Sequence, residues 1–221
     1  MQPRVRALAG AAYGALAIAD AWLAAGPPGR QRARLVTKPA LMPLLAATLG
    51  TGSPGSTGRD RGVVAAQAFS WGGDVALLKE GRGPLLAGLG SFLAAHLSYI
   101  SAFRRRSSVP LLGTPGRRRL LALCAVSNAG MALAAGRTDR TLALPVAAYG
   151  GALATMVASA TVVDADRGRR RILAGASLFL LSDTLLGLRL FVVGEEPRAL
   201  EGAVMATYTA AQWCIAAGSG A

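Results

Sequence analysis

The chain alternates between long apolar runs and short basic clusters, and this alternation restricts the folds open to it. Eight runs of about 15 to 23 apolar or small residues are separated by segments that hold most of the Lys and Arg residues. A helix needs about 20 such residues to cross a hydrocarbon core about 30 Å thick. Only 16% of the 221 residues are charged, whereas soluble domains carry about 25%. The sequence therefore predicts an all-α, polytopic membrane bundle of about eight transmembrane helices.

The expected spans form a single integral membrane domain over residues 1–221. Their approximate ranges are 5–25, 35–49, 62–78, 84–103, 120–135, 141–163, 172–193 and 200–217. The first run contains Asp20 and is long for the apolar part of a signal peptide, which favours a retained span over a cleaved leader. Pro43 lies deep enough in the second run to kink that helix. Segments 50–58 and 104–119 are predicted to be loops.

The net charge of +13 comes from basic residues that flank the runs. With eight spans, the amino terminus and the even-numbered loops share one side with fourteen Arg residues, against nine Lys and Arg on the other side. Cytoplasmic loops collect Lys and Arg, so both termini are expected in the cytoplasm. These loops suit membrane lipid headgroups and do not indicate a nucleic-acid partner. The composition, rich in Ala, Gly and Arg, is typical of a GC-rich bacterium and suggests its plasma membrane.

A few ionisable side chains lie within or at the edges of the apolar runs. A charge near the bilayer centre costs about 2.5–3.5 kcal/mol on insertion scales, which makes each one a candidate for function. We count residues along each span from the end on the membrane side opposite the two chain termini. On this count, Asp74 lies about 7 Å into the bilayer and Asp183 about 15 Å. The whole set falls in the same half of the bilayer, as a polar cavity requires: Asp20, Lys38, Asp74, His96, Asp183 and Arg189.

Asp183 and Asp74 are the strongest candidates. Asp183 lies near the middle of its run, where neither snorkelling nor a headgroup can reach it. Asp74 follows two glycines, which would let a neighbouring backbone or a substrate approach closely. A helix–helix hydrogen bond is the structural alternative for each. Two carboxylates in unlike surroundings can divide the roles of acid and base.

The other ionisable residues each have a structural interpretation as well. Lys38 opens a helix and fits a side chain that snorkels to the interface. Arg189 follows Asp183 by six residues, so the two point about 120° apart on an ideal helix, which favours a partner on another helix or a phosphate for Arg189. His96 belongs to an aromatic stripe more typical of packing than of catalysis. Asp20 fits an interfacial position, and polar residues such as Tyr149 and Tyr208 fit interhelical hydrogen bonds.

Common catalytic motifs are absent from the sequence. It has no GxSxG, HExxH or paired CxxC motif, and it contains one histidine and two separate cysteines. We therefore expect neither a metal site nor a cofactor. The classes left open are an enzyme that uses carboxylates, a small proton-coupled carrier and a non-catalytic lipid-binding protein.

Four segments of the chain resemble the lysoplasmalogenase family, also called the YhhN family. They carry the motifs T-K-P, G-D, F-x-x-A-H-x-x-Y and S-D, and the resemblance extends in order from about residue 13 to 215. The segments are Leu35–Pro39, Gly73–Leu78, Gly88–Phe103 and Gly175–Phe191. One departure from the family pattern is Gly187, which stands where we would expect a small residue such as Ala. This departure does not affect the charged positions.

The resemblance implies an enzyme that hydrolyses the vinyl-ether bond of lysoplasmalogens to a fatty aldehyde and a glycerophosphocholine or glycerophosphoethanolamine. The lysophospholipid is then the partner, and the oligomeric state is left open. Carried over by motif, the functional positions are Lys38, Asp74, His96, Tyr99 and Asp183.

The chemistry of the residues points the same way. A vinyl ether resists base but yields to acid, so its hydrolysis needs a protonated carboxyl and a carboxylate that activates water. We assign Asp74 and Asp183 to this pair without ordering them. His96 and Tyr99 are expected to contact the substrate, and Lys38 or Arg189 to hold its phosphate.

Overall fold

The computed structural model describes residues 3–48, 60–193 and 198–220, and every regular element in these ranges is helical. The prediction of an all-α fold is confirmed. The described α-helices are α1 (Pro3–Ala24), α2 (Arg34–Thr48), α3 (Arg61–Ala76), α4 (Arg82–Arg104), α5 (Pro115–Thr138), α6 (Ala143–Thr161), α7 (Arg169–Leu188) and α8 (Ala199–Ser219). Three short 3-10 turns, η1 (Pro28–Ala33), η2 (Arg140–Leu142) and η3 (Ala165–Arg167), and a π-helical turn, η4 (Arg189–Val193), complete the described elements.

Five of the described helices are long and apolar enough to cross a membrane, namely α1, α4, α5, α6 and α7. Helices α2 and α3 are shorter, at 15 and 16 residues, and α8 does not reach the same hydropathy over a full span. The count of eight spans and the single domain over residues 1–221 therefore remain predictions. The predicted end of the second span at residue 49 and the loop at 50–58 lie outside the described residues.

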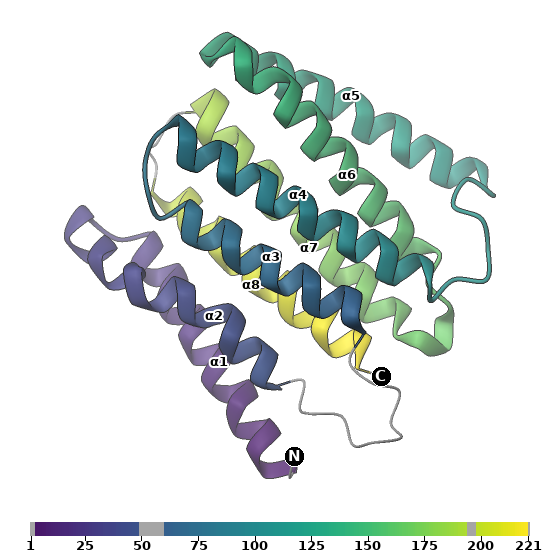
Figure 1. The fold of residues 1–221 in the computed structure, drawn as a ribbon, viewed down its shortest axis with the longest axis horizontal. Coiled ribbons are helices and arrows are strands. Elements are labelled where there is room, and N and C mark those ends of the chain that lie inside the picture. The colour runs from purple at the N-terminus through teal and green to yellow at the C-terminus, as the bar shows by residue number, and fades with distance from the viewer. Residues whose placement is uncertain (1–2, 49–59, 194–197, 221) are drawn as a thin grey trace.

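Seven of the described helices form a closed ring. Each packs against the next in the order α1, α2, α3, α4, α6, α7, α8, and α8 returns to α1. Helix α5 lies outside this ring along α6, at one edge of the molecule (Figure 1). A ring of this kind can shelter polar groups in its interior, where lipid does not reach them.

Aromatic side chains fill much of the ring interior. Phe179 of α7 packs edge-to-face on Tyr208 of α8, with ring centroids 5.5 Å apart, and Phe92 of α4 packs on the same tyrosine at 5.9 Å. Tyr99 and Phe103 of α4 stack on each other and are fully buried. The aromatic stripe seen in the sequence of α4 therefore faces the interior, and α4 is anchored by it.

Glycines allow two close approaches that shape the ring. A Cβ on Gly175 of α7 would lie 2.7 Å from the carbonyl oxygen of Ala211, so only glycine lets α7 and α8 meet this closely. A Cβ on Gly73 of α3 would lie 2.5 Å from the ring of Phe92. The space opened by Gly73, next to Asp74, is thus taken by the Phe92 side chain of α4.

Helix α2 runs through two prolines, Pro39 and Pro43, as one continuous element. Pro43 has no N–H, so the carbonyl of Pro39, four residues earlier, loses its usual helical donor. The indole N–H of Trp71 in α3 donates to that carbonyl at 2.9 Å. A side chain of the neighbouring helix thus satisfies a backbone acceptor that has no water partner in an apolar medium.

Candidate active site

A cavity of about 440 Å³ opens at one end of the ring. Its walls come from the ends of α3 and α7, the first turns of α2 and α8, and the first half of α4. This end lies opposite the first residues of α1 and the last residues of α8 (Figure 1). The exposed residues Lys79 and Glu80 mark the mouth of the cavity, which continues inward to Phe92 and Tyr208.

Asp74 and Asp183 both line this cavity. Asp74 stands on the last turns of α3 and its side chain is 2% exposed, whereas Asp183 stands on α7 and its side chain is 10% exposed. The structure thus brings two carboxylates from distant parts of the sequence to one enclosed space.

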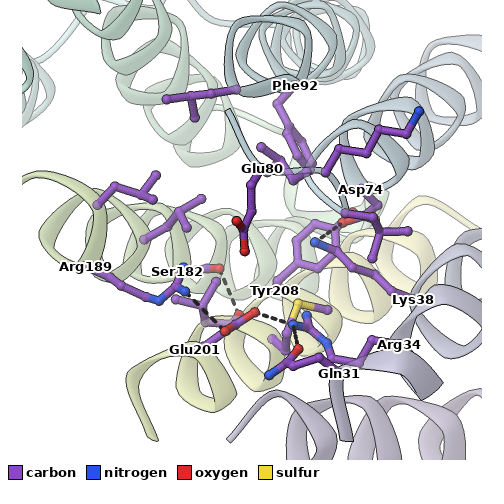
Figure 2. A pocket seen from close by; sticks show the side chains of 18 of the residues that line it. Gln31, Arg34, Lys38, Asp74, Glu80, Phe92, Ser182, Arg189, Glu201 and Tyr208 are labelled. Atoms are coloured by element: carbon purple, nitrogen blue, oxygen red, sulfur yellow. Dashed lines mark hydrogen bonds and ion pairs between the residues drawn. The ribbon is translucent and has the colours of Figure 1, made fainter. Parts of the chain in front are cut away.

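Asp74 is held by two polar partners. The Nζ atom of Lys38 lies 3.6 Å from its Oδ1, and the hydroxyl of Tyr208 donates to its Oδ2 at 2.7 Å. Figure 2 shows Lys38 pointing toward Asp74 across the cavity. Lys38 is itself buried, so it does not snorkel to a surface. An ammonium group and a hydrogen-bond donor both favour the ionised form of the carboxyl.

Asp183 has different neighbours. The hydroxyl of Tyr149 in α6 donates to its Oδ2 at 2.6 Å, and Nε2 of His96 lies 3.4 Å from the same oxygen. His96 is fully buried, and among the described residues neither of its ring nitrogens has a hydrogen-bond partner. Its ring packs against Tyr149 and Phe179 at 5.0 Å each. Within the described chain, no Lys or Arg forms an ion pair with Asp183.

A cluster of charges lies at the mouth. Glu201 of α8 accepts a hydrogen bond from Arg34 of α2, and its other oxygen lies 3.3 Å from Nη2 of Arg189. Asp20 of α1 lies 3.5 Å from Nε of Arg34 and accepts a hydrogen bond from Thr37 at 2.5 Å. Asp20 is fully buried within this cluster.

Four of the six residues predicted for the site line the cavity, namely Lys38, Asp74, Asp183 and Arg189. His96 lies behind Asp183, in contact with it but not on the cavity wall. Tyr99 lies apart from the cavity: its hydroxyl donates to the side-chain oxygen of Gln212 at 2.6 Å. A direct contact between Tyr99 and a substrate in this cavity therefore has no support in the geometry.

Four further residues of the site either had a different interpretation in the sequence analysis or were not singled out there. Tyr149 and Tyr208 were expected to form interhelical hydrogen bonds, and they do so, each donating to one of the two aspartates on another helix. Arg34 and Glu201 lie near the ends of apolar runs, where a charge carries no special signal. Arg34 and Glu201 are 167 positions apart in the sequence, so only the structure shows that they form a pair.

No three His, Cys, Asp or Glu side chains in the described ranges gather closely enough to hold a metal ion. The charged and phenolic groups that line the cavity are instead carboxylates, guanidinium groups, the ammonium groups of Lys38 and Lys79, and the phenol of Tyr208. Such a set can move protons and bind an anion.

The fold and the site together define a class: an α-helical integral membrane protein with two carboxylates on the wall of one cavity. The model of the YhhN family matches residues 33–219, and the chain belongs to that family. It is similar to the proteins named Lysoplasmalogenase of Mycobacterium bovis (strain ATCC BAA-935 / AF2122/97) and Mycobacterium tuberculosis (strain CDC 1551 / Oshkosh).

Each of these two relatives is 34% identical to the chain over 139 residues, which is 59% of the chain and 49% of the relative. The chain thus spans about half the length of the curated relatives it matches. No solved structure gives a significant match.

Proposed function

We propose that the protein is an integral-membrane hydrolase that cleaves the vinyl-ether bond of a lysoplasmalogen, releasing a fatty aldehyde and a glycerophospho-headgroup. The observation that carries the proposal is the presence of Asp74 and Asp183 on the wall of one secluded cavity. Membership of the YhhN family and the name of the two mycobacterial relatives, Lysoplasmalogenase, support the same reaction.

In the proposed reaction Asp183 is the acid. Its hydrogen-bond partner is the phenol of Tyr149, and, unlike Asp74, it forms no ion pair with a Lys or Arg of the described chain. A protonated Asp183 gives its proton to the β-carbon of the vinyl ether. The double-bond electrons form the new C–H bond, and an oxocarbenium ion results.

Asp74 is the base in this scheme. Lys38 and Tyr208 favour its carboxylate, which stabilises the oxocarbenium ion and accepts a proton from the attacking water. The hemiacetal that forms then breaks its C–O bond to the glycerol oxygen, which leaves as an alcohol with the proton that Asp74 returns. The hemiacetal hydroxyl gives up its own proton to Asp183, which restores the acid. The released carbonyl compound is the aldehyde, and one water molecule has been consumed.

The shape and lining of the cavity suit a lysophospholipid. Its wall includes Leu35, Leu77, Leu186 and Leu190, which can hold an alkenyl chain, and its mouth is charged, which can hold the phosphate. Lys38 pairs with Asp74, so Arg189 is the better placed of the two cations considered for the phosphate. His96 acts as a positioning residue behind Asp183, and Tyr99 as a supporting residue of the core.

The direct test is release of aldehyde from alkenyl-lysophosphatidylethanolamine by the purified chain in detergent, with an aldehyde trap as the readout. We expect activity in the wild type and a loss of at least about a hundredfold in Asp74→Asn and in Asp183→Asn. Asp166→Asn, at an exposed aspartate that does not line the cavity, is the matched control. Full activity in either cavity variant, with folding verified by thermal unfolding, contradicts the proposed pair.

A small proton-coupled carrier is the second candidate. The buried Lys38–Asp74 pair favours it, because paired ionisable groups inside a membrane also mark ion pathways. Proteoliposomes distinguish the two functions: a carrier accumulates intact lysophospholipid or protons without bond cleavage, whereas the hydrolase releases aldehyde whether or not a gradient is present.

A further inference from the structure

We propose that Arg34 and Arg189 form a phosphate subsite at the mouth of the cavity, and that Glu201 occupies this subsite as an internal competing anion until a phosphate displaces it. This inference deepens the proposed function and rests on it for the identity of the substrate. It concerns how the lipid is bound and leaves the bond-breaking step unchanged.

The geometry around Glu201 is that of an anion held between two guanidinium groups. One carboxylate oxygen accepts a hydrogen bond from Nη1 of Arg34, and the other lies 3.3 Å from Nη2 of Arg189. Figure 2 shows Glu201 between these two side chains. The three residues come from α2, η4 and α8, so three separate elements converge here. A phosphate offers oxygens at a similar spacing, and guanidinium groups bind carboxylate and phosphate in the same forked manner.

Arg34 stays in place without Glu201. Its Nε lies 3.5 Å from Asp20, its Nη1 donates to the side-chain oxygen of Gln31 at 3.1 Å, and its side chain is only 6% exposed. Arg189 has a donor to spare, because its buried Nε has no hydrogen-bond partner among the described residues. The two guanidinium groups are therefore a prepared site for an incoming anion.

Because of the charge balance, Glu201 and a bound phosphate cannot occupy this site together. Arg34 and Arg189 carry two positive charges, and Asp20 and Glu201 carry two negative charges. A phosphate added while Glu201 remains would place three anions against two cations in a largely buried cluster, and an uncompensated buried charge is costly. The side chain of Glu201 is 20% exposed and borders the cavity, so it has room to turn away.

One consequence is selection of the lipid class. A phosphate-bearing lysolipid can take the place of Glu201, whereas an uncharged glycerol ether with the same chain cannot. The cavity should therefore prefer lysophospholipids even when the reactive end of the lipid is identical.

The test measures binding without catalysis. The full chain in detergent is titrated by calorimetry with 1-alkyl-lysophosphatidylethanolamine, whose saturated ether is not hydrolysed, and with 1-alkylglycerol, which lacks the phosphate. We expect Glu201→Gln to bind the phospholipid about tenfold more tightly, because the competing charge is gone. Arg34→Gln and Arg189→Gln should bind it about ten- to a hundredfold more weakly. None of the three variants should alter binding of the alkylglycerol.

The matched control is Asp139→Asn, which removes a carboxylate from an ion pair with Arg82 outside the cavity and should leave both affinities unchanged. Weaker or unchanged binding of the phospholipid by Glu201→Gln overturns the competing role, and unchanged binding by the arginine variants overturns the subsite. Should Arg34→Gln not fold, Arg189→Gln decides alone, because Arg189 is the more exposed of the two. If the expected affinities are found but no alkenyl lipid releases aldehyde, the phosphate subsite stands and the proposed reaction fails.

Discussion

Replacement of Lys38 by Met should destabilise the protein because it leaves Asp74 buried without its cation. The Nζ–Oδ1 distance is 3.6 Å, and the two side chains are 9% and 2% exposed. At an effective dielectric constant of about 20, the attraction at this distance is about 4–5 kcal/mol. Breaking one side of a buried ion pair typically costs about 3–5 kcal/mol. We therefore expect Lys38→Met to lower the free energy of unfolding by about 3 kcal/mol.

The double variant Lys38→Met/Asp74→Asn separates the ion pair from the packing of either side chain. With both charges removed, most of the lost stability should return, which corresponds to a coupling energy of about 2 kcal/mol or more between the two positions. The measurement is unfolding in mixed micelles as the fraction of denaturing detergent rises. Aldehyde release should be lost in the single and the double variants alike, since each lacks the Lys38–Asp74 ion pair on which the proposed base depends.

Lys79→Met, the same chemical change at the exposed mouth, is the control and should alter stability by less than about 0.5 kcal/mol. A Lys38→Met protein that unfolds like the wild type, or a double variant no more stable than the single one, would show that the pair contributes nothing to folding. The assignment of Asp74 as the ionised base of the pair would then lose its support.

Three further outcomes are expected. Tyr149→Phe removes the 2.6 Å hydrogen bond to Asp183 and should lower kcat about tenfold with little change in KM, as steady-state aldehyde release will show. Partial burial raises the pKa of Asp60, but hydrogen bonds from the backbone N–H of Gly62 and the side chain of Arg106 outweigh this effect, so the pKa lies below its usual value. The contribution of Asp60 to stability is therefore present above about pH 4 and is lost as the pH falls through the lowered pKa. Asp60→Asn should remove this acid sensitivity, as thermal unfolding between pH 3 and 7 will show. If both termini are cytoplasmic, position 80 faces the outside of the cell and position 108 faces the cytoplasm. In a chain whose Cys124 and Cys214 are replaced by Ala, Glu80→Cys should then be labelled in intact cells and Ser108→Cys only after lysis. The reverse labelling pattern contradicts that orientation.

The sequence was sufficient for most of the helices and for placing the two aspartates in the same half of the bundle. The ranges predicted for the sixth and eighth spans, 141–163 and 200–217, differ by two residues or fewer at each end from α6 and α8. Counting from the helix ends placed Asp74 and Asp183 in the same half of the bundle because the rise of a helix per residue is fixed. Helix α5 begins five residues before the predicted position 120, since three arginines extend it and arginine is a good helix former that hydropathy does not count.

The arrangement of the helices around the cavity could not be obtained from the sequence. In a membrane the outer face of a helix is as apolar as its inner face, so the apolar pattern does not show which side packs on protein. Nothing in the run that forms α5 therefore indicates that it stays outside the ring. For the same reason, the convergence of Arg34, Glu201 and Arg189 depends on the order of the helices, which only the structure supplies.

The indole of Trp71 and the ring of Pro43 are complementary, and this has a consequence for how the family can vary. Trp71 supplies the hydrogen that Pro43 withholds from the carbonyl of Pro39. Where another family member has a residue with an N–H at the position of Pro43, that carbonyl regains its own donor and the indole becomes dispensable. Substitutions at these two sites, on adjacent helices, are thus expected to occur together as the protein diverges.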